Sequence, residues 1–292
     1  MGKGKIFLSK YSASGNDFIL TYHFYQSDWS QFAKSICNRW NGIGADGFIV
    51  ILPCSPVSEV EEREGYKWDK KGNFPKLSDQ SEGKKFKSNC HFRWQFYNSD
   101  GSIAEMCGNG SRATAHFAFQ MGLAPAQMVF STLAGKIGAT VKGDWVKTQL
   151  TPHRLVKEQF EEFGFRWKIY NTGVPHLVTI VENVEQFDLK IAQKMRWKYN
   201  ANVNFGSIEG KILKVRTFER GVEGETLACG TGICATFLTA RDLGMVGERV
   251  VAIPKSGEKL EVSIENGILH FAGRVKPLFS LQWEVEWGKE II

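Results

Sequence analysis

Apolar and polar positions alternate along most of the chain with the period of a β-strand. Alternating or fully apolar runs bounded by glycine and polar residues are typical of strands, and they occur at 5–8, 18–25, 48–52, 92–97, 129–148, 167–170, 176–181, 202–208, 211–219 and 283–287. Residues 9–17 are small and polar, which predicts a loop. Helical spacing is found from Trp29 to Trp40, where Asp28 can cap the first turn, and over 184–197. Two alanine-rich stretches, ending near Met121 and Leu243, also predict helices.

Each alanine-rich stretch begins with a cysteine, and the two beginnings are similar. The first reads Cys-Gly-Asn-Gly-Ser-Arg-Ala-Thr from Cys107, and the second reads Cys-Gly-Thr-Gly-Ile-Cys-Ala-Thr from Cys229. The cysteine, both glycines, the alanine and the threonine recur at a constant offset of 122 positions (229 − 107). Each copy follows a polar turn and leads into a helix, with the cysteine just before the helix start. The chain is therefore expected to consist of two related halves.

The position of these cysteines suits acid–base chemistry on a carboxylate substrate. Backbone N–H groups and the positive end of the dipole at a helix start favour an anion. The same position lowers the pKa of a thiol. Two such units predict that one thiol removes a proton from a carbon and that the other returns a proton to the opposite face. The alternative is that both cysteines are buried packing residues, a common role for free cysteine. Repetition of the whole Cys-Gly-x-Gly turn argues against that alternative.

Composition restricts the class of protein further. The chain has 292 residues, 42% of them hydrophobic, which is enough for one large or two medium domains. It contains no apolar run of membrane-spanning length and no secretory signal, so we expect a cytoplasmic protein without membrane contact. The net charge of +6 and nine tryptophans could suggest nucleic-acid binding. However, basic and acidic residues alternate, so we expect a solvated surface and no nucleic acid. The six cysteines and six histidines show no metal-ligand spacing, so we expect reduced thiols and no metal.

Residues from Pro53 to His91 differ from the rest of the chain. They are dense in lysine and glutamate and poor in aliphatic residues. This composition predicts a surface hairpin or partly disordered insertion at about 54–91 and not a separate domain. Cys54 and Cys90 flank the insertion and could lie near each other at its base.

Several segments, in order along the chain, resemble the diaminopimelate epimerase family. They are Ser-Gly-Asn-Asp-Phe at 14–18, Gly-Ile-Gly-Ala-Asp-Gly at 42–47, Phe-Tyr-Asn-Ser-Asp-Gly-Ser at 96–102, Glu-Met-Cys-Gly-Asn-Gly-Ser-Arg at 105–112, Gly-Val-Pro-His at 173–176, Asn-Val-Asn-Phe at 202–205, Glu-Arg-Gly at 219–221 and Cys-Gly-Thr-Gly at 229–232. The resemblance implies an α+β fold with two pseudo-symmetric domains. Each would be a β-barrel-like set of strands around a central helix, with the active site in the cleft between them. It further implies a first domain of 1–149 plus 277–292 and a second of 150–276, because the last strand returns to the first domain.

The same resemblance implies a function. The family interconverts LL- and meso-2,6-diaminopimelate without pyridoxal phosphate or any other cofactor, in bacterial lysine and peptidoglycan-precursor biosynthesis. Cys107 and Cys229 become the catalytic acid–base pair. By position, the substrate contacts become Asn16, Asn98, Gly108, Asn109, Asn202, Glu219, Arg220, Gly230 and Thr231. His176 and Glu219 become the groups that adjust the thiol pKa values. Whether the chain forms a homodimer is left open.

Two positions depart from the family pattern, and two other functions stay open. Val174 stands where many members have asparagine, and Gly47 where some have glutamine, although Asn171 could replace the former. The cysteine units alone would also fit a proline or hydroxyproline racemase, or an amino-acid-binding module without catalysis. Taken singly, the asparagines suit turns, His176 suits a structural histidine, and Glu219 with Arg220 suits a surface ion pair.

Overall fold

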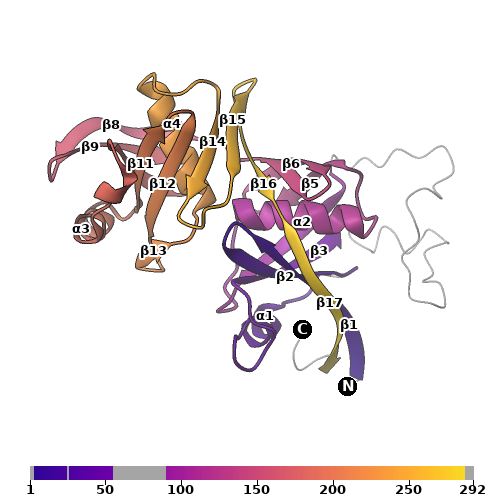
Figure 1. The fold of residues 1–292 in the computed structure, drawn as a ribbon. Helices are drawn as coiled ribbons and strands as arrows, with labels where there is room; N and C mark the ends of the chain where they lie inside the picture. Colours follow the sequence, from indigo (N-terminus) through magenta and orange to yellow (C-terminus); the bar gives the residue numbers. More distant parts are fainter. Residues whose placement is uncertain (1–2, 25, 55–89, 287–292) are drawn as a thin grey trace. The chain divides into compact units, whose positions relative to one another are not determined.

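The computed structural model describes residues 3–24, 26–54 and 90–286, and the chain divides into two compact units. The first unit is formed by Met1–Val146 together with Val275–Ile292, and the second by Lys147–Arg274. In the described residues, each unit combines strands with a thirteen-residue helix, α2 (Gly108–Gln120) in the first and α4 (Gly230–Asp242) in the second (Figure 1).

The first unit is a mixed sheet that joins both ends of the chain. In sequence order its strands are β1 (Lys3–Ala13), β2 (Asn16–Tyr22), β3 (Gly47–Pro53), β4 (Phe92–Asn98), β5 (Gln127–Thr132), β6 (Gly135–Lys142) and β7 (Trp145–Gln149), the last of which runs into the second unit. Neighbours pair from β1 to β6, parallel for β2–β3 and β4–β5 and antiparallel for the others. Strand β17 (Lys276–Glu286) pairs antiparallel with β1, so the last strand completes the sheet that the first strand begins.

Both faces of this sheet are buried, which explains its continuous apolar runs. Ile49 and Ile51 of β3 belong to the core around α2, whereas Phe48 and Val50 belong to the core around the short helix α1 (Ser30–Ile36). Successive side chains of a strand point to opposite faces. A strand with a helix on each side therefore needs apolar residues at every position.

The second unit repeats the arrangement with its own strands. They are β8 (Arg154–Glu162), β9 (Phe165–Asn171), β10 (Pro175–Ile180), β11 (Asn202–Glu209), β12 (Ile212–Glu219), β13 (Gly224–Thr226), β14 (Arg249–Pro254), β15 (Leu260–Glu265) and β16 (Ile268–Arg274). The β10–β11 and β12–β14 pairs are parallel, and β11–β12 is antiparallel. Helix α3 (Leu189–Tyr199) connects β10 to β11, preceded by a 3-10 turn at Val184–Gln186. The buried side of α4 packs on β10 and β11.

Several boundaries differ from the sequence-based prediction. Strand β1 continues to Ala13, so the loop expected at 9–17 is reduced to a tight turn at Ser14 and Gly15, with φ of 52° and 87°. Two successive positive φ values are typical of the turns that join twisted hairpins. Helix α1 ends at Ile36, and Trp40, placed on its apolar face by the prediction, is 93% exposed. The Asn38 side chain accepts hydrogen bonds from the backbone N–H groups of Trp40 and Asn41, which favours a turn there.

Cys54 and Cys90 form a disulfide with their Cα atoms 6.3 Å apart. The prediction that they lie close together is confirmed, and the prediction that all thiols are reduced is wrong for this pair. The disulfide joins the end of β3 to the start of β4, which are antiparallel neighbours. Residues 55–89, which make up nearly all of the insertion predicted at about 54–91, lie outside the described residues.

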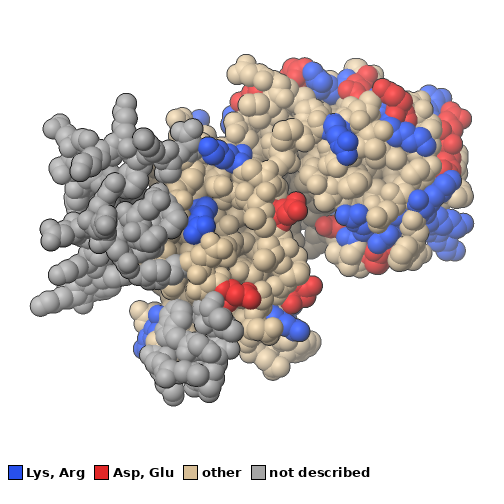
Figure 2. Space-filling model, turned by 180° about the vertical axis from the view of Figure 1, so that it is seen from behind, with Lys and Arg blue, Asp and Glu red and all other residues tan. Residues whose placement is uncertain are grey.

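Charged side chains of both signs lie beside one another on the face drawn in Figure 2. In the second unit some oppositely charged side chains form ion pairs: Arg216 contacts Glu185 at 3.0 Å and Glu225 at 2.6 Å. Within residues 3–24, 26–54 and 90–286, no helix combines the length and apolar character needed to span a membrane.

Candidate active site

In the first unit, Cys107 is the residue immediately before helix α2. Its backbone is extended, with φ −146° and ψ 122°, and its Sγ accepts a hydrogen bond from the backbone N–H of Gly110 at 3.4 Å. A side chain at Gly110 would press on Ile49 and on Cys107 itself, so the glycine lets the helix start lie close to β3. The N–H groups of the first helical turn lack partners within a helix. Cys107 therefore lies beside backbone donors that can stabilise a thiolate or a bound carboxylate.

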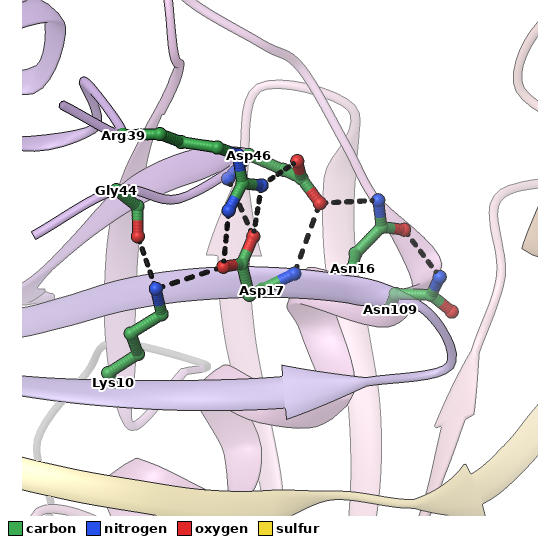
Figure 3. Close-up of polar contacts among 7 residues, drawn as sticks. All are labelled: Lys10, Asn16, Asp17, Arg39, Gly44, Asp46 and Asn109. Carbon is green, nitrogen blue, oxygen red and sulfur yellow. Dashed lines mark hydrogen bonds and ion pairs between the residues drawn. The ribbon is translucent and has the colours of Figure 1, made fainter. Parts of the chain in front are cut away.

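The side chains of Asn16 and Asn109 are connected, and each has a defined orientation. Asn109 Nδ2 donates to Asn16 Oδ1 at 2.7 Å, and Asn16 Nδ2 donates to Asp46 Oδ2 at 2.9 Å (Figure 3). At the other end, Asn109 Oδ1 accepts from the guanidinium of the fully buried Arg112 at 2.6 Å. This series of hydrogen bonds begins at the Arg112 cation and ends at the Asp46 carboxylate. It therefore determines which side of each amide donates and which accepts.

Asp46 is itself held in an ionic cluster at the start of β2. Arg39 contacts Asp46 and Asp17 at 2.8 Å each, and Lys10 pairs with Asp17 at 3.0 Å and with the carbonyl of Gly44 (Figure 3). Burial alone would raise the pKa of Asp17, but the hydrogen bonds and charges of Arg39 and Lys10 outweigh it and lower that pKa. The cluster ties the residue before β3 to the start of β2, where Asn16 lies.

Asn98 and Gly47 lie opposite each other at one end of the β3–β4 pair. Asn98 is exposed, and its side chain donates to Ser102 within its own turn at 3.0 Å. A Cβ at Gly47 would overlap the ring of Phe96 and the carbonyl of Tyr97. The glycine that departs from the family pattern is therefore required by the packing of Phe96.

In the second unit, Cys229 is the residue before helix α4 and is 8% exposed. Its Sγ lies 3.5 Å from the hydroxyl of Thr231, and His176 Nε2 lies 3.0 Å from the same hydroxyl. The Thr231 backbone carbonyl accepts from Thr172 at 2.9 Å, which fixes the start of the helix. Thr231 is thus the direct link between the histidine and the thiol.

His176 is completely buried and held from behind by Asn204. Asn204 Nδ2 lies 3.1 Å from His176 Nδ1 and 3.0 Å from the carbonyl of Leu177, and its Oδ1 accepts from Thr217 at 2.9 Å. Burial, with a smaller contribution from the charge of Arg220, lowers the pKa of His176 to about 3, so the imidazole is neutral at pH 7. A side chain at Gly232 would overlap the Asn204 amide, which explains why this turn requires its second glycine.

The other predicted substrate contacts of this unit, Asn202, Glu219 and Arg220, lie at or next to the ends of β11 and β12. Asn202 is opposite His176 in the parallel β10–β11 register, and its Oδ1 accepts from the backbone N–H of Arg220 at 2.7 Å. The Arg220 guanidinium donates to the carbonyl of Asn200 at 3.0 Å, and Glu219 ends β12. Asn171, the predicted substitute for the missing family asparagine, accepts from Gly173 within its own turn.

The structure therefore groups most predicted residues within their own unit. Asn16 and Asn109 are joined in the first, and His176, Thr231 and Cys229 in the second. Sequence reasoning missed Asp46, Arg112, Asn204 and Thr217, although the first three lie inside segments that carry the family resemblance. Among the described residues, no group of three His, Cys, Asp or Glu side chains could hold a metal ion.

Comparison with known proteins places the chain in a family. The family model described as diaminopimelate epimerase matches residues 79–156 and 169–270, which include both cysteine turns. A diaminopimelate epimerase from Nitratiruptor sp. is 49% identical over 281 residues, covering 96% of this chain and 99% of the relative. The chain belongs to the diaminopimelate epimerase family.

Further comparisons agree with this family and with the fold. The diaminopimelate epimerase from Campylobacter jejuni subsp. jejuni is 46% identical, covering 94% of this chain and 97% of the relative. A solved hydroxyproline epimerase from Agrobacterium vitis superposes with a TM-score of 0.65 at 13% identity, covering 97% of this chain and 94% of that chain. That likeness concerns the fold alone. The predicted family and the predicted α+β fold class are both confirmed.

Proposed function

We propose that this chain converts LL-2,6-diaminopimelate to the meso form by two-base proton transfer, with Cys107 acting on one face of the α-carbon and Cys229 on the other. The supporting observation is that each cysteine immediately precedes a matched thirteen-residue helix, in a chain 49% identical over 96% of its length to a diaminopimelate epimerase. A cytoplasmic location, expected from the sequence, is part of the proposal.

The difficult step of such a reaction is the charge that develops when the α-proton leaves. In the proposed mechanism one cysteine, as thiolate, removes the proton, and the other, as thiol, donates one to the opposite face. The charge spreads into the adjacent carboxylate. Backbone N–H groups of Gly108 and Asn109, and of Gly230 and Thr231, would stabilise that carboxylate, and one donor of this kind contributes about 2.7–4 kcal/mol to the transition state.

Recognition of the second amino-acid end of the substrate requires paired polar groups. Glu219 suits an ammonium group, Arg220 suits a carboxylate, and asparagines can satisfy either. In this proposal Asn16, Asn98 and Asn202 supply the amides. The oriented chain from Arg112 through Asn109 and Asn16 to Asp46 supports such a role, because it leaves each amide with a defined donor side.

The experiment that tests the proposal compares three amino acids on the purified full-length chain. LL-diaminopimelate, L-proline and trans-4-hydroxy-L-proline are incubated separately in D₂O, and isomer ratio and deuterium at the α-carbon are measured. Epimerisation of diaminopimelate alone, with one deuterium per turnover, supports the proposal. Turnover of proline or hydroxyproline alone would favour the racemase alternative, and binding without exchange of any of the three would favour a catalytically silent module.

A further inference from the structure

The hydrogen bonds behind Cys229 have a fixed polarity that begins at Asn204. The carbonyl of Leu177 can only accept, so the amide edge that faces it at 3.0 Å must be the NH₂ group. The hydroxyl of Thr217 then donates to the amide oxygen on the other edge at 2.9 Å. These two contacts, from β10 and β12, leave Asn204 only one way to lie on β11.

This orientation determines the tautomer of His176. Asn204 Nδ2 lies 3.1 Å from His176 Nδ1 and has a hydrogen to donate, so Nδ1 must be the bare nitrogen. The alternative tautomer would place two N–H hydrogens against each other. Burial keeps the ring neutral, so its single N–H is on Nε2, which faces the Thr231 hydroxyl at 3.0 Å.

A hydroxyl that accepts from Nε2 has its own hydrogen available for Cys229, whose Sγ is 3.5 Å away. We propose that Asn204 and Thr217 are positioning residues for Cys229: they hold the tautomer of His176 that makes the Thr231 hydroxyl a donor to the sulfur. Their importance for turnover rests on the proposed function, whereas the hydrogen-bond chain does not.

These hydrogen bonds suit a thiol that must both remove and donate a proton. When Cys229 is a thiolate, the Thr231 hydroxyl donates to it. When Cys229 carries the proton, rotation of the hydroxyl lets Thr231 Oγ1 accept from the S–H group without movement of any heavy atom. A protonated histidine at this place would stabilise only the thiolate. A neutral histidine that acts through the Thr231 hydroxyl stabilises the thiolate and the thiol of Cys229 more equally.

The tautomer can be measured directly. Full-length protein labelled with ¹⁵N-histidine is examined by NMR at pH 7, and the His176 signals are assigned by their absence in His176→Gln. We expect a bare Nδ1 and a protonated Nε2. A protonated Nδ1 would overturn the proposal, and neither result depends on whether the protein turns over diaminopimelate.

The contact between Thr231 and Cys229 is tested by alkylation of Cys229 with iodoacetamide at pH 7, quantified by peptide mapping. Thr231→Val removes the hydroxyl at nearly constant shape and should slow alkylation of Cys229 by about three- to tenfold, the effect of one lost hydrogen bond. Thr231→Ser, which keeps the hydroxyl, should stay within about twofold of wild type. Cys107 in the same samples is the internal control and should not change. Equal rates in the valine and serine variants would refute the donor role of the hydroxyl.

Asn204→Asp tests the first contact in this series of hydrogen bonds, between Asn204 and His176. A carboxylate in place of the NH₂ group draws the proton to Nδ1, so Nε2 becomes an acceptor and takes the Thr231 hydrogen away from the sulfur. The folded variant should show a protonated Nδ1 and slow alkylation of Cys229, with Thr231 intact. Unchanged alkylation in a variant with a wild-type circular-dichroism spectrum would refute the role of Asn204. If this variant does not fold, the wild-type tautomer and the threonine pair still decide the matter.

Wild-type turnover separates the two proposals. A bare Nδ1 with no epimerisation of LL-diaminopimelate would remove the proposed function and leave the hydrogen-bond chain. Epimerisation with a protonated Nδ1 would do the opposite. If both hold, Thr231→Val should lower kcat with little change in KM, because its backbone N–H remains in place.

Discussion

Cys107 and Cys229 occupy equivalent places before their helices, yet different groups reach their sulfur atoms. Cys107 accepts from the Gly110 backbone N–H, whose position is set by the helix, whereas Cys229 faces the rotatable hydroxyl of Thr231. Asn109 is the equivalent of Thr231 in the first copy of the repeat, but its side chain is hydrogen-bonded to Asn16 and Arg112. The cysteines themselves could be predicted from local sequence. Their partners could not, because a side chain such as Asn204 reaches His176 only through the register of β10 and β11.

Replacing either cysteine should stop the reaction. Cys107→Ala and Cys229→Ala each remove one member of the acid–base pair, so kcat for LL-diaminopimelate should fall by at least about 10²–10⁴-fold. Turnover is measured by the appearance of the meso isomer. Cys234→Ala, a buried cysteine further along α4, is the matched control and should keep activity if it folds. Near-wild-type turnover in either of the first two variants contradicts the two-thiol mechanism.

Asp46 should matter for substrate binding without being part of the chemistry. In Asp46→Asn the new amide can present its NH₂ group to Asn16, so the Asn16 amide loses its fixed orientation. We expect KM to rise about tenfold, the effect of one charged hydrogen bond, with a smaller change in kcat. Steady-state kinetics measure both constants. Asp188→Asn, which keeps a capping side chain on α3, is the control. A fall in kcat larger than the rise in KM would contradict a positioning role.

The buried neutral state of His176 makes stability depend on pH. Its pKa is about 3 in the folded chain, below the ordinary value of 6.5, so the unfolded chain binds more protons between these two values. This contribution is complete above pH 6.5 and is lost as the pH falls from 6.5 toward 3. Urea unfolding at pH 7 and pH 5 should show a smaller loss of stability for His176→Gln than for wild type. Other partly buried histidines act in the same direction, so the difference between the proteins is the relevant quantity. Equal losses would mean that His176 is not held neutral.

The helices and turns that are determined by residues close together in the sequence were predictable. The cysteine turns predicted α2 and α4, and the turn at 171–175 was predicted as found. The long β1 was missed because its second half consists of small and polar residues that pair with β2 and β17, which lie elsewhere in the sequence. The single helix predicted over 184–197 is divided, because Asp188 accepts from Ile191 N–H and begins α3 anew.

The close contact between α4 and β11 depends on Gly232. In Gly232→Ala the added methyl group would overlap the Asn204 amide, so either the helix or the amide must move. We expect a loss of about 1–3 kcal/mol in unfolding free energy and slower alkylation of Cys229. Gly247→Ala, at a position with open space, is the control and should be nearly neutral. Denaturant unfolding measures the first effect, and equal stability of the two variants would contradict it.

For the molecule as a whole, the pairing of distant segments was only partly predictable. The return of the last strand to the first unit was an implication of the family resemblance, and β17 pairs with β1 along most of its length. The disulfide was missed because cysteine count and spacing indicated reduced thiols. The sequence predicted that Cys54 and Cys90 lie near each other, but only the structure shows that they are joined, at the neighbouring ends of β3 and β4.

The disulfide should stabilise the first unit without affecting the chemistry. Replacing both Cys54 and Cys90 by serine removes a cross-link between positions 36 residues apart. We expect a loss of about 2–4 kcal/mol in unfolding free energy, with kcat unchanged. Urea titrations of the wild type with and without reductant should differ in midpoint, and those of the double variant should coincide. Coincident curves for the wild type would contradict a stabilising cross-link.

The β1–β17 pairing also has a consequence for synthesis of the chain. A ribosome releases β1 long before β17 exists, on the order of tens of seconds at common elongation rates. The second unit is complete in sequence at Arg274, before the strand that β1 needs on its outer edge. In a chain that ends at Arg274 and has been released from the ribosome, we therefore expect the second unit to resist proteolysis better than the first. In the same chain the first unit lacks β17, so β1 remains an open sheet edge, the kind of surface that cellular chaperones protect.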